Sequence, residues 1–392
     1  MDRIRELQKR LRRERIDLAI VMQPRDLYYY SGTAQPCNLV VPAAGEPLLF
    51  VRRAWEFVIE ETDLAASQVL RGAGLPEIHA VLKSRKIPEG RIAVTEDAIP
   101  AGIYKKVQAT FRDSEIVDLS PLVLEQRMIK DAEELQSICR AADMFRYAHQ
   151  AVLEFLRPGV TEVQLAARVL EKIRENGGES IVRNRRWDAS LPPEGLVVSR
   201  ANMWKISGHA MTITGVGLSR SLPWGASGTA IQPGDLVILD MGINRQGYHA
   251  DIARTYVAGG ASSEQREVFG QVLAIQQAIL DKIRPGIAAG ELYAIAAAKA
   301  AELGRFEFFQ GFDEMKGRYI GHGLGLELDE PPTLDGKNGA CLRPGMVLAI
   351  EPKLIIPGFG GVVLEDDVIV TEDGYRLITP VESTLFEVFP KG

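Results

Sequence analysis

The chain has 392 residues, 46% hydrophobic and 25% charged, a composition typical of a globular protein long enough for two substantial cores. Its net charge of −6 excludes the strongly basic surface that non-specific nucleic-acid binding requires. No apolar run reaches membrane-spanning length and the charged opening residues do not look like a signal peptide, so we expect a cytoplasmic protein with no nucleic-acid or membrane partner.

The first third of the chain alternates helical and extended patterns. The opening residues repeat apolar side chains at helical spacing, and residues 17–22 follow as an apolar run typical of a buried strand. These patterns predict a small α/β domain with a mixed sheet over residues 1–125, followed by a second domain over residues 126–392. Further strands of the first domain are predicted at 27–32, 38–41, 47–51, 92–95 and 116–119.

In the second domain one pattern occurs twice: a helix, the tripeptide Arg-Pro-Gly, and another helix. We expect an internal two-fold repeat from this pattern, with a ligand site between the halves that draws side chains from both. The first pair of predicted helices spans about 132–156 and 161–176, and the second about 263–283 and 291–303.

Two aspartates, Asp240 and Asp251, lie at the ends of a predicted strand, turn and strand. They are equidistant from the expected centre of the turn, so a simple antiparallel hairpin makes them cross-strand neighbours about 5 Å apart on one face. Two buried carboxylates at that distance repel each other, and they require a cation between them or a shared proton.

A second carboxylate pair, Glu351 and Glu365, is arranged in the same way around Gly358, and His322 lies between the two hairpins among glycines that permit close backbone approach. Four carboxylates carry a charge of −4, which two divalent ions neutralise. Oxygen-rich ligation with one imidazole suits Mn²⁺, Co²⁺, Fe²⁺ or Zn²⁺. We therefore predict two divalent metal ions held by Asp240, Asp251, His322, Glu351 and Glu365.

With these residues the chain resembles the pita-bread metallopeptidases, a family that includes methionine aminopeptidase, aminopeptidase P, prolidase and the non-peptidase creatinase. The resemblance covers nearly the whole chain. It implies an α+β architecture: a C-terminal pita-bread domain with a pseudo-two-fold repeat, preceded by a smaller creatinase-type α/β domain. It also implies that the five residues are the metal ligands, that Glu351 is in addition the proton shuttle for the metal-activated water, and that the protein is a homodimer. The motifs that carry it are Asp26–Gly32, Arg127–Lys130, Arg157–Gly159, Gly234-Asp235, Asp240–Gly242, Asp251–Thr255, Gly321–Gly323, Glu351-Pro352 and Glu365-Asp366.

Three positions differ from the peptidase pattern. Trp224 and Asp329 occupy places where peptidase relatives carry histidines, and Val363 stands where proline-specific relatives often carry an arginine. An aromatic face and an anionic oxygen near the metals suit a cationic small molecule. Alternatively, Trp224 only packs a wall and Asp329 orients His322. We therefore treat Asp329 as a candidate catalytic residue, and Trp224 and the loop residue His209 as candidate substrate contacts.

Other polar residues are expected to be structural. His249 alternates with Asp251 along one hairpin and is read as a packed strand residue, although it could approach the site. His149 lies on a predicted helix, and the basic run 183–187 is expected to form a solvated face.

The favoured function is a metal-dependent hydrolase resembling Xaa-Pro aminopeptidase or dipeptidase, which releases an N-terminal residue from short proline-containing peptides. The alternative is a non-peptidase relative, resembling creatinase, ectoine-type hydrolases or the dimethylsulfoniopropionate lyase, that cleaves a C–N or C–S bond of a small cationic substrate. A catalytically silent binding protein is disfavoured because all five ligands are present.

Overall fold

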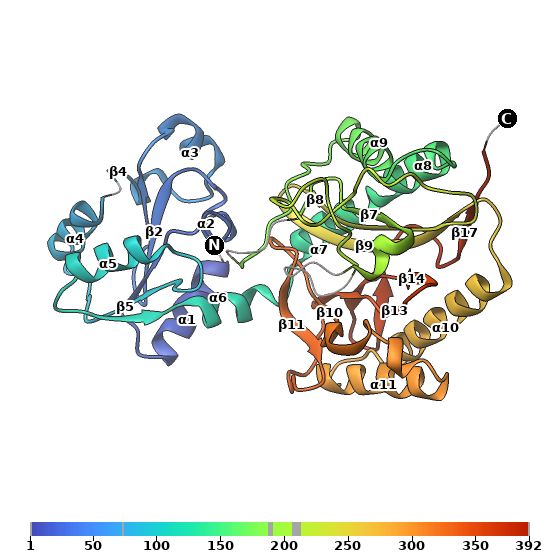
Figure 1. Cartoon of the computed structure of the whole chain (residues 1–392). Helices are drawn as coiled ribbons and strands as arrows, with labels where there is room; N and C mark the ends of the chain where they lie inside the picture. Colours follow the sequence, from blue (N-terminus) through green and yellow to red (C-terminus); the bar gives the residue numbers. More distant parts are fainter. Residues whose placement is uncertain (1, 73, 187–190, 206–212, 391–392) are drawn as a thin grey trace. The chain divides into compact units, whose positions relative to one another are not determined.

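The computed structural model describes residues 2–72, 74–186, 191–205 and 213–390. The chain divides into two compact units, Met1–Arg127 and Met128–Gly392, each with its own hydrophobic core (Figure 1). No described helix has both the length and the apolar character needed to cross a membrane.

The N-terminal unit is built on a six-stranded sheet with the strand order β4-β3-β2-β1-β5-β6. Only β2 is antiparallel to its neighbours, so the predicted mixed sheet is confirmed. The strands are β1 (Leu18–Val21), β2 (Cys37–Pro42), β3 (Leu48–Val51), β4 (Val69–Arg71), β5 (Arg91–Val94) and β6 (Glu115–Asp118). The helices are α1 (Asp2–Arg13), α2 (Pro24–Ser31), α3 (Trp55–Glu61), the 3-10 turn η1 (Ala66–Gln68), α4 (Leu75–Ser84), α5 (Ala101–Thr110) and α6 (Ser120–Arg127).

The strand predicted at residues 27–32 is wrong, because residues 27–31 belong to helix α2 and Gly32 caps its end. The side chain of Gln23 accepts a hydrogen bond from the backbone N–H of Asp26, and Pro24 occupies the first turn, where its missing N–H costs nothing. Gly32 then ends the helix in the left-handed conformation at φ 79°. These end signals outweigh the strand preference of three consecutive tyrosines.

The C-terminal unit contains two larger sheets and one hairpin, with the strand orders β17-β9-β8-β7, β11-β10-β12-β15-β16 and β13-β14. The first sheet consists of β7 (Leu196–Ser199), β8 (Leu236–Arg245), β9 (Tyr248–Ala258) and β17 (Phe386–Val388). The others are formed by β10 (Tyr319–Gly323), β11 (Glu330–Asp335), β12 (Val347–Ile350), β13 (Lys353–Ile356), β14 (Gly360–Val363), β15 (Asp366–Val370) and β16 (Tyr375–Leu377). The helices are α7 (Ala132–Asp143), α8 (Phe145–Phe155), α9 (Glu162–Glu175), α10 (Ser263–Leu280) and α11 (Ala289–Glu302), with 3-10 turns η2 (Arg200–Trp204), η3 (Phe306–Phe308) and η4 (Asp313–Met315).

The helix pairs predicted from the Arg-Pro-Gly repeat are present. Helix α8 packs on α9 and α10 packs on α11, and the glycines that end the two tripeptides, Gly159 and Gly286, have φ of 91° and 88°. The single long helix predicted over 132–156 is wrong, because the chain forms two helices, α7 and α8, that meet at Met144.

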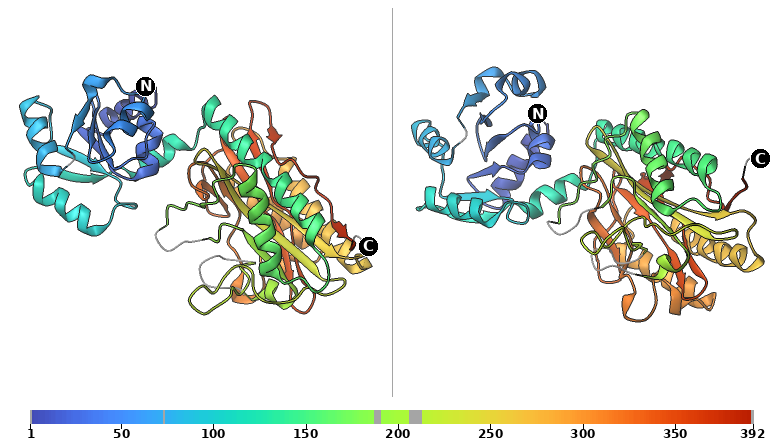
Figure 2. Two further views of the ribbon diagram at one scale, coloured as in Figure 1. Left: turned by 90° about the horizontal axis from the view of Figure 1, so that it is seen from above. Right: turned by 45° about the horizontal axis from the view of Figure 1, so that its top comes forward.

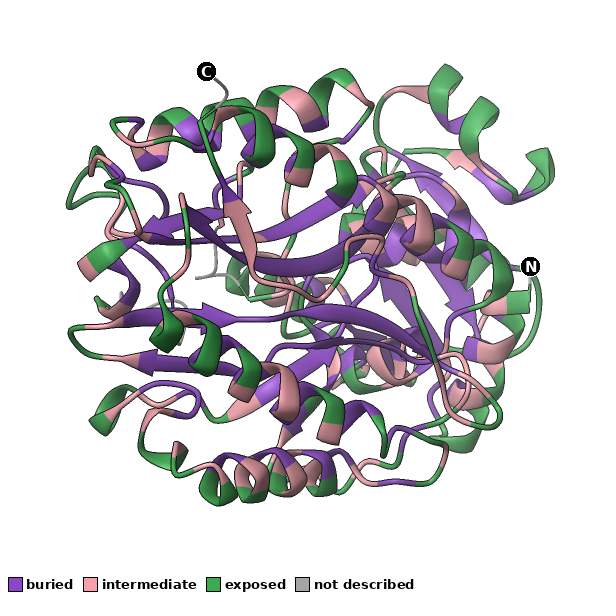
Figure 3. Cartoon of the chain, turned by 90° about the vertical axis from the view of Figure 1, so that its right-hand side faces the viewer, coloured by how far each residue is buried: buried purple, intermediate pink, exposed green. Residues whose placement is uncertain are grey.

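The strands of this unit lie between the two sets of helices (Figure 1). Both views of Figure 2 show α8 and α9 along one face of the sheet that contains β8 and β9. Figure 3 shows long buried strands in purple between helices that expose one side to solvent. Alternate residues of β8 enter the two cores, since Val237 and Leu239 pack towards α7–α9 whereas Leu236 and Ile238 pack on the opposite side.

A buried glutamate, Glu162, connects the start of α9 to two loops. Its carboxylate accepts hydrogen bonds from the backbone N–H and hydroxyl groups of both Ser199 and Ser227, at 2.6–2.9 Å, and from the amide of Asn202 at 3.1 Å. Ser227 lies three residues beyond Trp224, so this network fixes one end of the segment that carries the tryptophan.

Candidate metal centre

Asp240 and Asp251 share a face of the β8–β9 hairpin, although they are not direct neighbours. The predicted pairing of Asp240 with Asp251 is wrong. Asp240 is opposite Ala253 and Asp251 is opposite Gly242, so each aspartate faces a residue two positions away from the other aspartate. The turn residues are Gln246 and Gly247, both with positive φ, and the hairpin is therefore centred one residue later than expected. The aspartates are diagonal neighbours on the face that points away from α7–α9.

Glu351 and Glu365 follow the predicted symmetry. They lie immediately outside the hairpin β13–β14, where Lys353 pairs with Val363, and immediately inside the pair β12–β15, where Ile350 faces Asp366. Both ladders are symmetric about Gly358, as expected from the sequence. The two glutamates therefore occupy opposing positions between the ladders.

His322 lies on β10, next to the strand that leads to Glu351. A Cβ on Gly321 would lie 2.1 Å from the carbonyl oxygen of Ala349, and one on Gly323 would lie 2.3 Å from that of Pro331. Only glycine fits these places, which confirms the expected close backbone approach around the histidine. The ring places Nδ1 2.9 Å from the carbonyl oxygen of Gly323, to which an Nδ1–H would donate, and this tautomer leaves Nε2 for a ligand.

The five side chains converge in the interior. Oxygen atoms of Asp251 and Glu365 and a ring nitrogen of His322 lie within 4.8 Å of one another. The Nε2 atom of His322 is 3.7 Å from Oδ2 of Asp251 and 3.9 Å from Oε1 of Glu351. Asp240 is partly buried, and the other four are at most 7% exposed.

The buried acids repel one another. Burial, together with the charges of Asp240, Asp367 and Glu351, raises the pKa of Asp251 well above its usual range. Burial and the charges of Asp251 and Asp240 likewise raise the pKa of Glu365. For Asp240 burial raises the pKa to about 6, against the opposing effect of the Lys353 ammonium.

This electrostatic cost is the kind that a bound cation removes. Oδ1 of Asp251 is buried and has no hydrogen-bond partner among the described residues, as expected for an atom that accepts a metal. Four carboxylates and one imidazole also form a donor set that suits divalent ions of the first transition series. The residues present therefore fit a metal centre.

Neighbouring residues hold the ligands in place. The backbone N–H of Asp251 donates to Oδ2 of buried Asp367 at 3.0 Å. Arg254 is fully buried, pairs with Asp366 at 2.6 Å, and donates to the carbonyl oxygen of Glu365 at 2.7 Å. The backbone that carries the two acids is thus fixed from both sides.

Lys353 is a charged residue of this centre that the sequence analysis missed. It is 5% exposed, and its ammonium pairs with Oε2 of Glu351. Burial alone would lower the pKa of Lys353, but the carboxylates of Glu351, Asp240 and Glu365 raise it above its ordinary value. The available signal was a lysine in an apolar strand two residues after a predicted ligand, the same kind of context that pointed to the glutamates.

The other three predicted site residues, Asp329, Trp224 and His209, differ in how far the structure describes their surroundings. Oδ1 of Asp329 lies 3.2 Å from Nε2 of His322, and its side chain is 51% exposed. Burial lowers the pKa of His322, but the charges of Asp329 and Glu351 outweigh this effect and raise it overall. Trp224 is partly buried in a tight segment in which a Cβ on Gly217 would lie 2.6 Å from the tryptophan carbonyl oxygen. His209 lies outside the described residues.

Two expectations for neighbouring residues have different outcomes. His249 is fully buried, its Nδ1 lies 3.1 Å from the carbonyl oxygen of Gly325, and its Nε2 accepts from the backbone N–H of Arg183, so it is a packed strand residue as predicted. The solvated face predicted for the basic run is wrong at Arg185, because this side chain is 9% exposed and lies 3.7 Å from buried Glu327.

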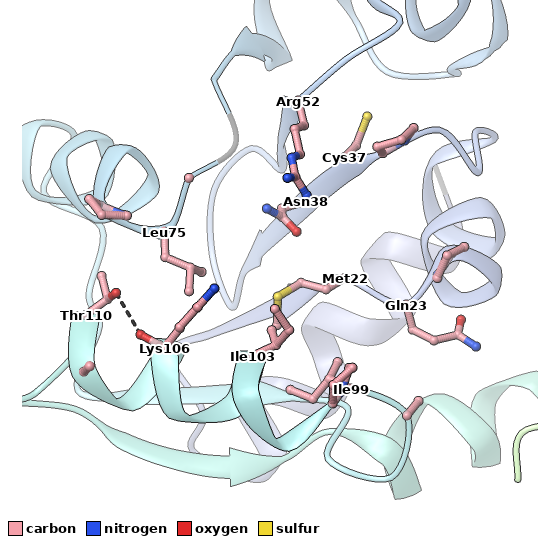
Figure 4. A pocket seen from close by; sticks show the side chains of 17 residues that line it. Met22, Gln23, Cys37, Asn38, Arg52, Leu75, Ile99, Ile103, Lys106 and Thr110 are labelled. Atoms are coloured by element: carbon pink, nitrogen blue, oxygen red, sulfur yellow. Dashed lines mark hydrogen bonds between the residues drawn. The ribbon is translucent and has the colours of Figure 1, made fainter. Parts of the chain in front are cut away.

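A cavity of about 730 Å³ lies in the N-terminal unit. Figure 4 shows Arg52 and Lys106 at its border, together with apolar side chains such as Met22, Leu75 and Ile103. None of the predicted site residues within the described ranges lines it, so it is separate from the metal centre.

Comparisons with known proteins agree with this geometry. Residues 136–372 match the model of metallopeptidase family M24, and residues 3–129 match the creatinase/prolidase N-terminal domain. The "Uncharacterized peptidase YqhT" of Bacillus subtilis (strain 168) is 33% identical over 290 residues, 74% of this chain and 72% of that protein. The Xaa-Pro dipeptidase of Pyrococcus furiosus is 29% identical over 387 residues, 98% of this chain and 99% of that protein.

Among solved structures, the prolidase from Pyrococcus horikoshii OT3 superimposes with a TM-score of 0.81 at 26% identity, covering 98% of this chain and all of that one. The architecture expected from the sequence, a creatinase-type domain followed by a pita-bread domain, is therefore confirmed. With a matching family model over most of its length and a buried group of side chains that could hold a metal ion, the chain belongs to metallopeptidase family M24 and is a metallohydrolase of that family.

Proposed function

We propose that this enzyme releases an N-terminal residue that precedes proline, with Xaa-Pro dipeptides as its principal substrates. The observation that carries the proposal is the convergence of Asp240, Asp251, His322, Glu351 and Glu365 in one buried cluster. Relatives named Xaa-Pro dipeptidase align over almost the full length of the chain, and this supports a peptide substrate over the small cationic compound of the alternative.

The metal ions of this proposal are two divalent ions drawn from Mn²⁺, Co²⁺, Fe²⁺ and Zn²⁺. Asp251, His322 and Glu365 form the compact group that would hold one of them, and Asp240 and Glu351 complete the set. When bound, such ions polarise a peptide carbonyl and activate water.

We assign a separate role to each of the other side chains of the site. Glu351 is the proposed acceptor of the proton from the attacking water, and the 3.9 Å distance between its Oε1 and Nε2 of His322 supports this role. The half-exposed carboxylate of Asp329 lies beside His322, where it suits the α-ammonium group of a peptide's first residue. Trp224 and His209 are the proposed contacts for the rest of the substrate.

The test uses purified protein loaded with Mn²⁺ or Co²⁺ and four compounds: Ala-Pro, Ala-Pro-Ala, N-acetyl-Ala-Pro and creatine. We expect release of alanine from Ala-Pro, little turnover of the acetylated peptide, and none of creatine. Comparable turnover of Ala-Pro-Ala would assign the enzyme to the aminopeptidases rather than the dipeptidases. Turnover of creatine without release of alanine would replace the proposal with the alternative.

A variant isolates the role of Asp329. We expect Asp329→Asn to raise KM for Ala-Pro about tenfold, the loss that corresponds to roughly 1.4 kcal/mol of binding. The metal content should stay unchanged, because Asp329 is not one of the five proposed ligands. An unchanged KM would remove Asp329 from substrate recognition.

The family resemblance also leads us to propose a cytoplasmic homodimer. Light scattering coupled to size-exclusion chromatography should give twice the chain mass of 43.1 kDa. A monomer mass at micromolar concentration would contradict this expectation.

A further inference from the structure

The two carboxylate oxygens of Glu351 have different neighbours. The ammonium of Lys353 pairs with Oε2, whereas Oε1 lies 3.9 Å from Nε2 of His322. Both side chains are almost fully buried, at 5% and 7% exposure. A buried ammonium is costly unless it is paired, so this contact holds both groups in one arrangement.

The position of Lys353 has a counterpart on the neighbouring strand. In the β13–β14 ladder Lys353 is directly opposite Val363, the position at which the family resemblance leads us to expect an arginine. Side chains of directly opposed residues lie on the same face of the ladder, about 5 Å apart. The ammonium group of Lys353 on β13 therefore lies on the same side of the hairpin as a cationic side chain at position 363 of β14 would.

Two other buried cations among the described residues of this unit have different partners. Arg254 pairs with Asp366, and Lys130 lies 3.4 Å from Glu330. Lys353, in contrast, pairs directly with Glu351, which is one of the five proposed ligands. Its ammonium group therefore lies against the proposed metal-binding cluster.

We propose that Lys353 is a positioning residue of the metal centre. By engaging Oε2 of Glu351, it would leave Oε1 as the oxygen available to a metal ion, and it supplies from β13 a positive charge that Val363 does not. The catalytic consequence rests on the proposed peptidase function, whereas the effect on metal coordination does not.

The experiment compares wild type with Lys353→Met, Lys353→Gln, Lys353→Arg and the double variant Lys353→Met with Val363→Arg. Lys337→Met, at an exposed lysine of the same unit, is the matched control. The first readout is the visible absorption spectrum of the Co²⁺-loaded proteins, which reports the number and geometry of the ligands and needs no substrate. The second is the division of any activity loss on Ala-Pro between kcat and KM.

We expect Lys353→Met and Lys353→Gln to change the Co²⁺ spectrum, because Glu351 becomes free to bind through both oxygens. In both variants kcat should fall about 100-fold, a loss typical of misplaced catalytic groups, with KM changed less than threefold. Lys353→Arg and the double variant should recover the wild-type spectrum and most of kcat, and Lys337→Met should match wild type throughout.

The outcomes separate the parts of the proposal. Wild-type spectra in both the Met and the Gln variants would overturn it. Recovery by Lys353→Arg without recovery by the double variant would overturn the equivalence of the two strands. If no protein releases alanine, the peptidase function fails while the spectra still decide the role of Lys353. If the Met and Gln variants do not fold, the double variant decides: a wild-type spectrum supports the proposal and an altered one overturns it.

Discussion

At the scale of single residues, Asp251 shows why a metal belongs in this protein. Its carboxylate is buried beside other acids that raise its pKa, and one of its oxygens has no described hydrogen-bond partner. In the metal-free protein its buried charge opposes folding, whereas a proposed metal ligand should contribute to binding once metal is added. Removing its charge should therefore have opposite effects on the two forms.

We expect Asp251→Asn to raise the Tm of the metal-free protein by about 2–4 °C, the shift that corresponds to 1 kcal/mol in a unit of this size. The same variant should lose the metal-induced rise in Tm that wild type shows, because a ligand is gone. Thermal melts with and without Mn²⁺ measure both effects. Asp113→Asn, at an exposed aspartate, should behave like wild type. A variant that is less stable than wild type without metal would show that repulsion is not the dominant effect.

The residue types of the centre could be predicted from the sequence, but parts of its geometry could not. The symmetry of Glu351 and Glu365 about Gly358 is visible in the order of residues and is confirmed by the register. The offset of Asp240 from Asp251 depends on which two residues form the turn, and several polar residues in that segment could do so. Lys353 was missed because lysine is usually a surface residue.

At the scale of elements, Arg254 connects β9 to the start of β15 and to the segment that follows β16. Besides Asp366 and the carbonyl of Glu365, it donates to the backbone carbonyls of Val381 and Glu382 at 2.6 and 3.0 Å. These contacts join parts of the chain that are more than 100 residues apart.

Arg254→Met should lower the free energy of unfolding by about 3–5 kcal/mol, because it leaves the buried Asp366 carboxylate without its charged partner. Arg266→Met is the matched control, since the Arg266–Glu387 pair is exposed at the arginine and should contribute less than about 1 kcal/mol. Urea unfolding of the metal-free proteins measures both. Equal losses of unfolding free energy in the two variants would show that burial does not make the Arg254–Asp366 pair more important than the exposed pair.

The packing of α8 on β9 predicts a pH dependence. Burial, together with the charge of Arg254, lowers the pKa of His149 from 6.5 to about 4, while its ring contacts Tyr256 and Phe386. Between the folded pKa of about 4 and the unfolded pKa of about 6.5, the unfolded chain binds a proton that the folded protein does not. The neutral histidine therefore contributes its full stabilisation of the fold above pH 6.5, and this contribution is lost as the pH falls towards 4.

We therefore expect the unfolding free energy of wild type to fall more steeply than that of His149→Gln between pH 6.5 and 4. The acids of the metal centre titrate in both proteins, so the difference between the two curves isolates the histidine. Parallel curves would show that His149 has an ordinary pKa.

Elements with strong end signals could be predicted, and those decided by tertiary packing could not. The start of α9 is visible in Thr161 and Gln164, which form a capping box in the structure. The division of residues 132–156 into α7 and α8 leaves no comparable mark, because Met144 keeps helical backbone angles and no proline or glycine is present.

At the scale of the whole molecule, the two units have separate cores, and all five proposed ligands belong to residues 128–392. We expect calorimetry to resolve two unfolding transitions, of which only one moves to higher temperature when Mn²⁺ is added. One transition that shifts as a whole would show that the units unfold together.

The architecture was predictable because the sequence repeats one helix pair and contains the family motifs from end to end. The two helix pairs are present in the structure, and the expected creatinase-type and pita-bread architecture is confirmed by the matched family models and by the superposition on a solved prolidase. The roles proposed for Trp224 and Asp329 could not be predicted to the same degree, because an aromatic or acidic residue outside the regular helices and strands is compatible with several substrates. His209 lies outside the described residues.

The Glu162 network has a consequence for redesigning selectivity. Its five donor groups secure the segment beside Trp224 from a point outside the metal centre. Randomised libraries at position 224 should therefore vary the proposed substrate contact while the surrounding loop stays folded. Directed evolution of this enzyme should accept substitutions there far more readily than at Glu162, which appears in none of the proposed catalytic steps.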